Sequence, residues 1–259
     1  MFALGKAFKY SMWACSFLFA YHLYIVKKME NPDEASFKIF YFLEMAKKAD
    51  WHMYQLNLLL TRPPVQKLMP DRPPAPPGAI YPKVLVLNLR GTLIHSEYKF
   101  GIGFEVKKRP GLSMLINRLS RLYEIVIFSD EEQGIVQDIC MALDPIGQSI
   151  PGRFGREATL LHKGTYVKDL SYLNRPIKDI VYVDVDDSKV AFHKENCLMI
   201  PFWDGNEDDR ELYELLPFLE SLGNKHGCDV RKEIDKIGRE NTGKKYHDMM
   251  VVRRDMIRK

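Results

Sequence analysis

The chain has 259 residues, of which 46% are hydrophobic and 28% are charged, and its formal net charge is +4. This composition is ordinary for a globular protein, and four cysteines without a C-x-x-C pair predict neither a metal site nor a disulfide framework. Residues 223–259 hold 11 Lys and Arg against 6 Asp and Glu, so the rest of the chain carries about −1. A positive charge confined to a mixed-sign tail excludes a basic domain face, so we expect no nucleic-acid partner.

An uncharged run of 17 residues occupies positions 10–26, from Tyr10 to Val26. A helix that spans a bilayer needs about 17–25 such residues, and aromatic rings at both ends of this run suit the two membrane interfaces. After an N-terminal segment 1–9, we therefore predict a transmembrane helix over 10–28. A cleaved signal sequence is the alternative, but the run is long for a signal core and no A-x-A site follows it. Lysines on both sides leave its orientation open.

The next two segments are predicted to connect the membrane to a folded domain. Asn31-Pro32-Asp33-Glu34 is a good helix start, and aromatic residues spread over a wide arc of the amphipathic helix predicted for 31–60. This helix should lie on the bilayer surface, on its own domain or on a partner. Residues 61–82 contain 8 prolines in 22 positions, so they form an extended, semi-rigid spacer.

The remaining chain alternates between buried strands and helices, which predicts an α/β fold with a mainly parallel sheet. We place this domain at 83–222 and treat 223–259 as a basic C-terminal extension. The expected strands lie at 83–89, 124–128, 179–185 and 198–200, the helices at 111–122, 131–143 and 208–222, and a small hairpin at 159–161 and 165–167.

Polar residues follow three of the predicted strands. They are Asn88-x-Arg90-x-Thr92, Ser129-Asp130 and Asp184-Val185-Asp186-Asp187. The carboxyl ends of parallel strands meet at one edge of a sheet, where ligands bind in open α/β folds. The sequence therefore predicts one crevice that contains all three groups.

This arrangement resembles the haloacid dehalogenase superfamily, and most closely its phosphatases of the polymerase C-terminal-domain type. In those enzymes the first strand ends in D-x-D-x-T, whose first Asp attacks phosphorus and whose second is the general acid. Ser129, Lys168 and Asp184 match the family's hydroxyl, lysine and late magnesium-binding Asp. The resemblance implies a Rossmann-like domain with a small β-hairpin insertion.

Longer sequence motifs narrow the resemblance to one family. R-P-G at 109–111, Y-E-I-V-I-F-S at 123–129, Y-V-K-D-L-S-Y-L-N-R at 166–175 and P-F-W-D-G-N-E-D-D at 201–209 follow one another along the domain. In this order they are similar to the fifty-kilodalton receptor subunit of the mitochondrial presequence translocase. The resemblance covers about 80–235. It implies an inner-membrane protein with one N-terminal anchor and its domain in the intermembrane space.

Two substitutions predict that the catalytic chemistry is lost. Asn88 stands at the nucleophile position, and an amide cannot form an acyl phosphate. Arg90 stands at the general-acid position, and a guanidinium holds its proton too tightly for useful proton transfer near neutrality. We therefore expect a pseudophosphatase with no cofactor and no metal. We hypothesise that Arg90 replaces the metal by pairing with Asp184 or Asp186; the alternative is that Arg90 points to solvent. Thr92, Ser129 and Lys168 are expected to be retained for structure, with Lys168 paired to an Asp.

A receptor for presequences, which are basic amphipathic helices, needs an apolar groove with acidic flanks. Two acidic clusters, at 130–132 and 207–209, are candidates for these flanks. The alternative for each cluster is an ordinary solvent-exposed surface. The candidate binding residues are Asp130, Glu131, Glu132, Trp203, Glu207, Asp208 and Asp209.

Two other functions stay open at this stage. The resemblance implies membrane-embedded protein partners and presequence peptides, but a fold does not fix a function. The chain could instead be a structural accessory subunit of a respiratory-chain complex or ATP synthase. A third possibility, an active membrane-tethered phosphatase, is disfavoured by the two missing carboxylates.

Overall fold

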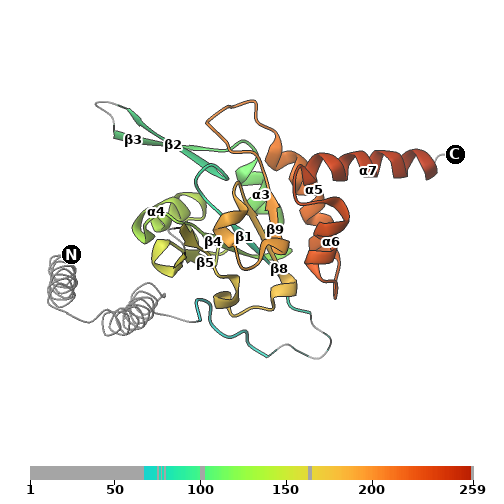
Figure 1. Ribbon diagram of the computed structural model, residues 1–259, viewed down its shortest axis with the longest axis horizontal. Coiled ribbons are helices and arrows are strands. Elements are labelled where there is room, and N and C mark those ends of the chain that lie inside the picture. The colour runs from blue at the N-terminus through green and yellow to red at the C-terminus, as the bar shows by residue number, and fades with distance from the viewer. Residues whose placement is uncertain are drawn as a thin grey trace, which may run out of the picture. The chain divides into compact units, whose positions relative to one another are not determined.

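The computed structural model describes residues 67–74, 76, 78, 80–99, 103–162 and 165–257. The predicted transmembrane helix over 10–28 and the amphipathic helix over 31–60 lie outside these residues. Among the helices that are described, none has the length and apolar character needed to cross a bilayer. The described residues form the folded domain and the segment that leads into it (Figure 1).

A five-stranded parallel sheet forms the centre of the domain. Its strands are β1 (Lys83–Leu87), β4 (Tyr123–Phe128), β5 (Gly152–Phe154), β8 (Ile180–Asp184) and β9 (Cys197–Met199), in the order β5-β4-β1-β8-β9. All four strand pairs are parallel. The predicted α/β fold with a mainly parallel sheet is confirmed. Every residue of β1 and β8 is buried, as continuous apolar strands covered on both faces require.

The two faces of the sheet are covered differently. Leu85 and Leu87 of β1 belong to a core that includes apolar residues of the helices α3 (Leu112–Leu119), α4 (Gln133–Leu143) and α5 (Glu211–Asn224). Val84 and Val86 point to the other face, because side chains alternate along a strand. That second face is covered by extended segments and short 3₁₀ helices rather than by α-helices. These are η1 (Arg156–Ala158), η2 (Leu170–Leu173), η3 (Ile177–Asp179), η4 (Asp187–Val190) and η5 (Lys194–Asn196).

Two antiparallel ribbons extend from the sheet. The predicted hairpin is confirmed as β6 (Leu160–His162) paired with β7 (Thr165–Val167). A longer ribbon, β2 (Ile94–Lys99) with β3 (Gly103–Lys108), was not predicted. It leaves the domain at the edge where β1 ends and projects beyond the helices (Figure 1).

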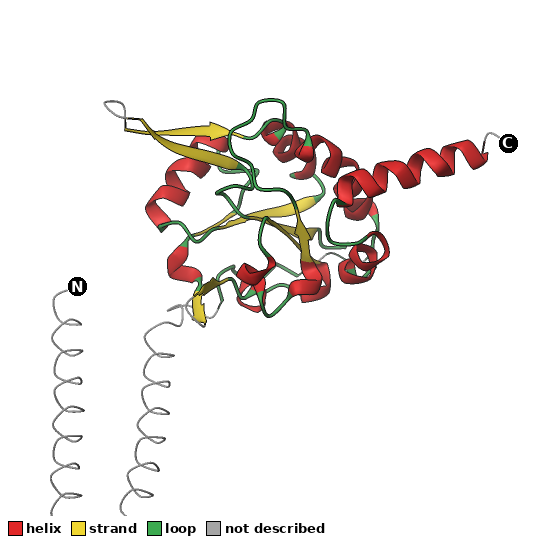
Figure 2. Ribbon diagram, turned by 45° about the horizontal axis from the view of Figure 1, so that its top comes forward, coloured by secondary structure: helices red, strands yellow, loops and turns green. Residues whose placement is uncertain are grey.

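Two helices follow the predicted domain. α6 (Val230–Ile237) buries Val230 and Ile234 in the helix-covered core. α7 (Thr242–Ile257) begins against α5, and its C-terminal half points away from the domain (Figures 1 and 2). Apart from Arg239, which lies in the loop between them, the basic residues between 230 and 257 are carried by these two helices.

The described part of the proline-rich segment is extended and packs along the domain. Met69 is buried with the second core, and the Leu68 amide donates to the Tyr172 carbonyl at 2.8 Å. Glu124, at the amino end of β4, accepts hydrogen bonds from the guanidinium groups of Arg72 and Arg175 at 2.6–3.2 Å. The segment is thus fixed at the edge of the sheet opposite the strand ends that form the crevice.

Candidate functional site

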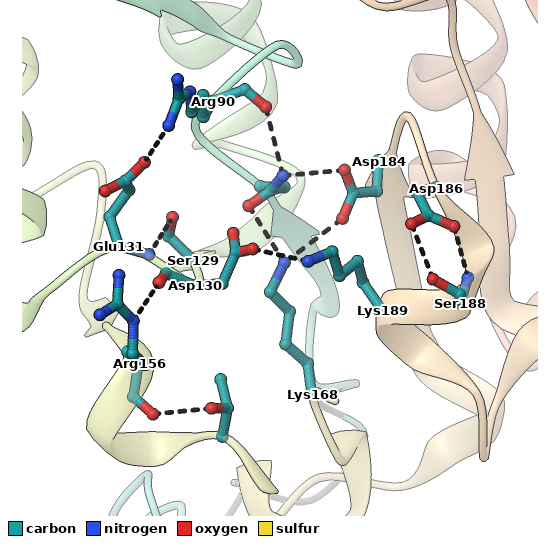
Figure 3. A network of polar contacts seen from close by, with 12 residues as sticks. Arg90, Ser129, Asp130, Glu131, Arg156, Lys168, Asp184, Asp186, Ser188 and Lys189 are labelled. Carbon is teal, nitrogen blue, oxygen red and sulfur yellow. Dashed lines mark hydrogen bonds and ion pairs between the residues drawn. The ribbon is translucent and has the colours of Figure 1, made fainter. Parts of the chain in front are cut away.

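Three neighbouring strands bring the predicted crevice residues together. Asn88 follows β1, Ser129 follows β4 and Asp184 ends β8, and these strands lie next to one another in the sheet. Lys168, which follows β7, reaches the same point from the 3₁₀-covered face. The prediction of a shared crevice at the carboxyl edge is therefore supported by the geometry (Figure 3).

Asp184 is the centre of a buried hydrogen-bond network. Its Oδ1 accepts from Asn88 Nδ2 at 2.8 Å, from Thr92 Oγ1 at 3.2 Å and from the Val185 amide at 2.7 Å. Its Oδ2 accepts from Lys168 Nζ at 3.3 Å and from the Tyr182 hydroxyl. Both carboxylate oxygens are therefore satisfied by protein groups, with no accessible surface left on the side chain.

The ammonium of Lys168 completes this network. It donates to Asn88 Oδ1 at 3.0 Å and to the Tyr182 hydroxyl at 2.9 Å, in addition to Asp184. Burial lowers the pKa of Lys168, and the adjacent carboxylate of Asp184 opposes that shift. Burial also raises the pKa of Tyr182 well above its usual value, and Asp184 adds to the effect. The predicted pairing of Lys168 with an Asp is confirmed.

Tyr182 was not among the predicted site residues. Its position two residues before Asp184 in β8 gives both side chains the same face of the strand. That alternation is the signal in the sequence that could have identified it.

Arg90 does not replace a metal ion, so this hypothesis is wrong. Its guanidinium is 63% exposed and lies 3.6 Å from the Glu131 carboxylate, while Asp186 accepts from the amide and hydroxyl of Ser188. The physical reason is the turn after β1, where Gly91 adopts φ +71° and directs Arg90 away from Asp184 (Figure 3). The neutralising cation is Lys168 instead.

The acidic run at 130–132 is largely engaged with neighbouring cations. Lys189 Nζ donates to Asp130 at 2.8 Å, and Glu131 faces Arg90. Burial alone would raise the pKa of Asp130, but the hydrogen bond from Lys189 and the charge of Lys168 leave it lowered. Glu132, just before α4, is exposed. The Ser129 hydroxyl is buried and accepts from the Glu131 amide, which is a structural role.

The second predicted cluster, around 203–209, divides into a buried and an exposed part. Trp203 is only 2% exposed and donates its indole N–H to the Asn206 carbonyl, so it belongs to the core. Asp209 accepts two hydrogen bonds of 2.8 Å from the buried guanidinium of Arg109. Glu207 and Asp208 remain exposed. With Tyr213 and Pro110 they border a hollow of about 410 Å³.

The network does not fit the magnesium ion that the resemblance implies. Magnesium is bound by hard anionic oxygens and keeps several waters, whereas Asp184 is enclosed by donors and has the Lys168 ammonium beside it. Across the part of the chain that the structure describes, no group of three or more His, Cys, Asp or Glu side chains could hold a metal.

Comparison with known proteins gives consistent matches. The family model of the NLI interacting factor-like phosphatases matches residues 83–231. The chain is 32% identical over 236 residues to the mitochondrial import inner membrane translocase subunit TIM50-A of Drosophila melanogaster, covering 89% of this chain and 66% of that protein. It is 38% identical over 172 residues to TIM50-B of the same organism, covering 66% of this chain and 42% of that protein.

The chain therefore spans less than two thirds of the length of these curated relatives. Among solved structures it is similar to Fcp1, an essential RNA polymerase II CTD phosphatase. That likeness has 16% sequence identity and a TM-score of 0.40, and covers 62% of this chain and 56% of the other.

Proposed function

Because the chain belongs to the family of NLI interacting factor-like phosphatases, we propose that its domain is a catalytically inactive member that binds partners instead of cleaving phosphate esters. The observation that carries this proposal is the saturated environment of Asp184. An amide, a hydroxyl and a buried ammonium donate hydrogen bonds to its two carboxylate oxygens, and the amide belongs to Asn88, at the nucleophile position.

The chemistry of the flanking residues supports inactivity. Asn88 turns its amide nitrogen toward Asp184 and its oxygen toward Lys168, so both polar atoms are committed. A carboxylate nucleophile is needed for an acyl-phosphate intermediate. Arg90 contacts Glu131, and a guanidinium is not a useful general acid, so this position lacks the acid that the reaction needs.

The relatives support a proposal for the cellular role. Proteins named as subunits of the mitochondrial import inner membrane translocase share 32–38% identity with this chain. We infer that the chain serves the same translocase as a receptor for presequences, passing preproteins to membrane-embedded partners. It would be anchored in the inner membrane by the helix predicted at 10–28, with its domain in the intermembrane space.

The exposed part of the 203–209 cluster is the better of the two candidate presequence surfaces. Glu207 and Asp208 are exposed acidic groups, whereas Asp130 and Glu131 face cations of their own. Tyr213, at 45% exposure, borders the same hollow and adds apolar surface, and Phe202, earlier in the same segment, is 60% exposed. A basic amphipathic helix needs this combination of acidic and apolar groups.

Peptide binding by the purified full chain tests the proposal. Glu207→Lys with Asp208→Lys should weaken the affinity for a basic presequence peptide by about tenfold at low salt, because two attractive charges become repulsive. The matched control is Asp138→Lys with Asp235→Lys, two exposed carboxylates on α4 and α6. Equal affinities for the two variants would contradict this surface. Hydrolysis of an aryl phosphate by the purified chain would contradict the inactive state.

A second candidate function is a structural accessory subunit of a respiratory-chain complex or ATP synthase. One observation favours it, since α7 carries exposed apolar residues beyond the domain. Stoichiometric co-purification with such a complex, and not with the translocase channel, would support this second function.

A further inference from the structure

The C-terminal half of α7 exposes apolar side chains that the domain does not cover. Met250, Val251 and Val252 are 40–53% exposed, and Met256 is 68% exposed. Figures 1 and 2 show this part of the helix pointing into solvent, away from the sheet.

The first turns of α7 are held firmly, so the direction of the helix is set by the domain. Gly243 lies against the backbone of Glu214, where an added Cβ would approach to 2.6 Å. The Tyr246 ring meets Phe218 of α5 edge-on, with 5.5 Å between ring centroids. Met249 marks the boundary, because it borders a hollow with these two rings yet is 47% exposed. The residues after it project from a fixed base.

The exposed apolar residues occupy all sides of the helix. Consecutive residues are about 100° apart around an α-helix, so Met249 to Val252 point in four different directions. A helix that lies on a membrane surface needs one apolar face and one polar face. The turn 249–252 has no polar face to turn toward water, so it suits enclosure by a partner rather than a position on a membrane surface. With 16 residues and several charges, α7 is too short to span a bilayer.

The charges near this segment indicate the chemistry of what encloses it. Between Thr242 and Lys259 there are six Lys and Arg and two Asp, a net charge of +4. That equals the formal net charge of the whole chain. Arg253 and Arg254 follow the apolar residues directly, so they would lie at the rim of any cavity that received them.

We infer that residues 249–252 of α7 are an interaction segment that a protein partner encloses in an apolar cavity with an acidic rim. This surface lies on a different helix from the exposed residues at 202–213 and does not depend on presequence binding. The protein partner is favoured over a bilayer because the apolar residues surround the helix, and over a second copy because two such segments would repel through their positive charge.

Site-specific photo-crosslinking of the full chain in its own mitochondria tests this inference. A benzophenone amino acid is placed singly at Met250, Val251 and Val252, and at Met141 of α4 as a control with 56% exposure. All three α7 positions should give an adduct with the same protein, whose crosslinked peptides lie beside Asp or Glu residues, and the control position should not. Adducts with lipid alone, adducts with a second copy alone, or adducts from only one of the three positions would overturn the inference.

Charge reversal supplies the second measurement. Arg253→Glu with Arg254→Glu should reduce the adduct yield at Val251 several-fold, whereas Lys178→Glu with Lys232→Glu, two exposed lysines elsewhere in the domain, should not. Equal adduct yields at Val251 in the two variants would overturn the inference that the partner's cavity has an acidic rim. The variant Arg253→Glu with Arg254→Glu should not alter the affinity for presequence peptides, so failure of this inference and failure of the proposed receptor function can be told apart.

Discussion

Lys168 and Asp184 form an ion pair with no solvent exposure, in which the ammonium nitrogen lies 3.3 Å from a carboxylate oxygen. Removing either partner leaves an uncompensated buried charge, whereas replacing both does not. The site that resembles a catalytic centre is therefore expected to behave in solution as a part of the core.

Loss of the cation alone should be severe. Lys168→Met is expected to lower the free energy of unfolding by about 3–5 kcal/mol, since Asp184 loses the buried cation that is paired with it. The double variant Lys168→Met with Asp184→Leu should recover part of that loss. Urea unfolding followed by circular dichroism measures both. A double variant no more stable than the single one would show that the pair is not coupled in this way.

A carboxylate at position 88 should destabilise the site unless a cation binds there. Asn88→Asp replaces a donor to Asp184 with a second negative charge beside it, in a buried site that holds one lysine. We expect a lower melting temperature and a partial recovery with millimolar Mg²⁺, because an opposite charge relieves the repulsion. The native chain and an exposed control, Asn206→Asp, should not respond to Mg²⁺ in thermal unfolding. A magnesium response in the native chain would contradict the assignment of a metal-free site.

Glu124 should contribute to acid sensitivity. Burial by itself raises the pKa of this carboxyl group, but the hydrogen bonds from Arg175 and Arg72 outweigh it and leave the pKa lowered. A lowered pKa in the folded state means that the stabilisation is present above the usual Glu pKa of about 4.3 and is lost as the pH falls through the folded value.

The Glu124→Gln variant should therefore be less stable at neutral pH and lose less stability below about pH 4 than the native chain does. Urea titrations from neutral pH to pH 3 provide the comparison. Glu207→Gln, at an exposed position, controls for the loss of one negative charge. A parallel pH profile for the native chain and the Glu124 variant would refute the prediction.

Gly91 should resist substitution for reasons of backbone geometry. Its φ of +71° is unfavourable for other residues, and an added Cβ would overlap the Phe202 ring. Gly91→Ala is expected to cost about 1–2 kcal/mol of unfolding free energy. Because Phe202 is 60% exposed and can move, Gly91→Ala with Phe202→Ala should recover little. Full recovery in thermal unfolding would assign the cost to the ring instead.

The parallel strands could be predicted from sequence because strands buried on both faces are continuous apolar runs. V-L-V-L at 84–87 and I-V-Y-V at 180–183 have this form, and both are strands. The β2–β3 ribbon lacks the signal. It is a two-stranded element beginning I-H-S-E, and the described side chains at 95–97 are only half-buried, so no apolar alternation indicates it.

Residue spacing located the crevice but did not predict where each side chain points. Asn88 and Arg90 are two residues apart and would share a face if β1 continued, but the strand ends at Leu87 and the chain turns at Gly91. Which cation neutralises Asp184 therefore depended on a turn conformation. The surroundings of Trp203 and Asp209, two candidate binding residues, were unpredictable for a similar reason, because they depend on contacts with His95 and Arg109 far away in the sequence.

The attachment of residues 67–72 has a mechanical consequence. A pulling force applied along the chain from its N-terminal side would reach the domain at the amino edge of the sheet, where Arg72 and Arg175 grip Glu124 and where the Leu68 amide is bonded to Tyr172. These contacts precede β1 along the chain, so they would bear the load before it reached the strand. The crevice network at the opposite edge of the sheet would therefore stay undisturbed while the domain was under tension.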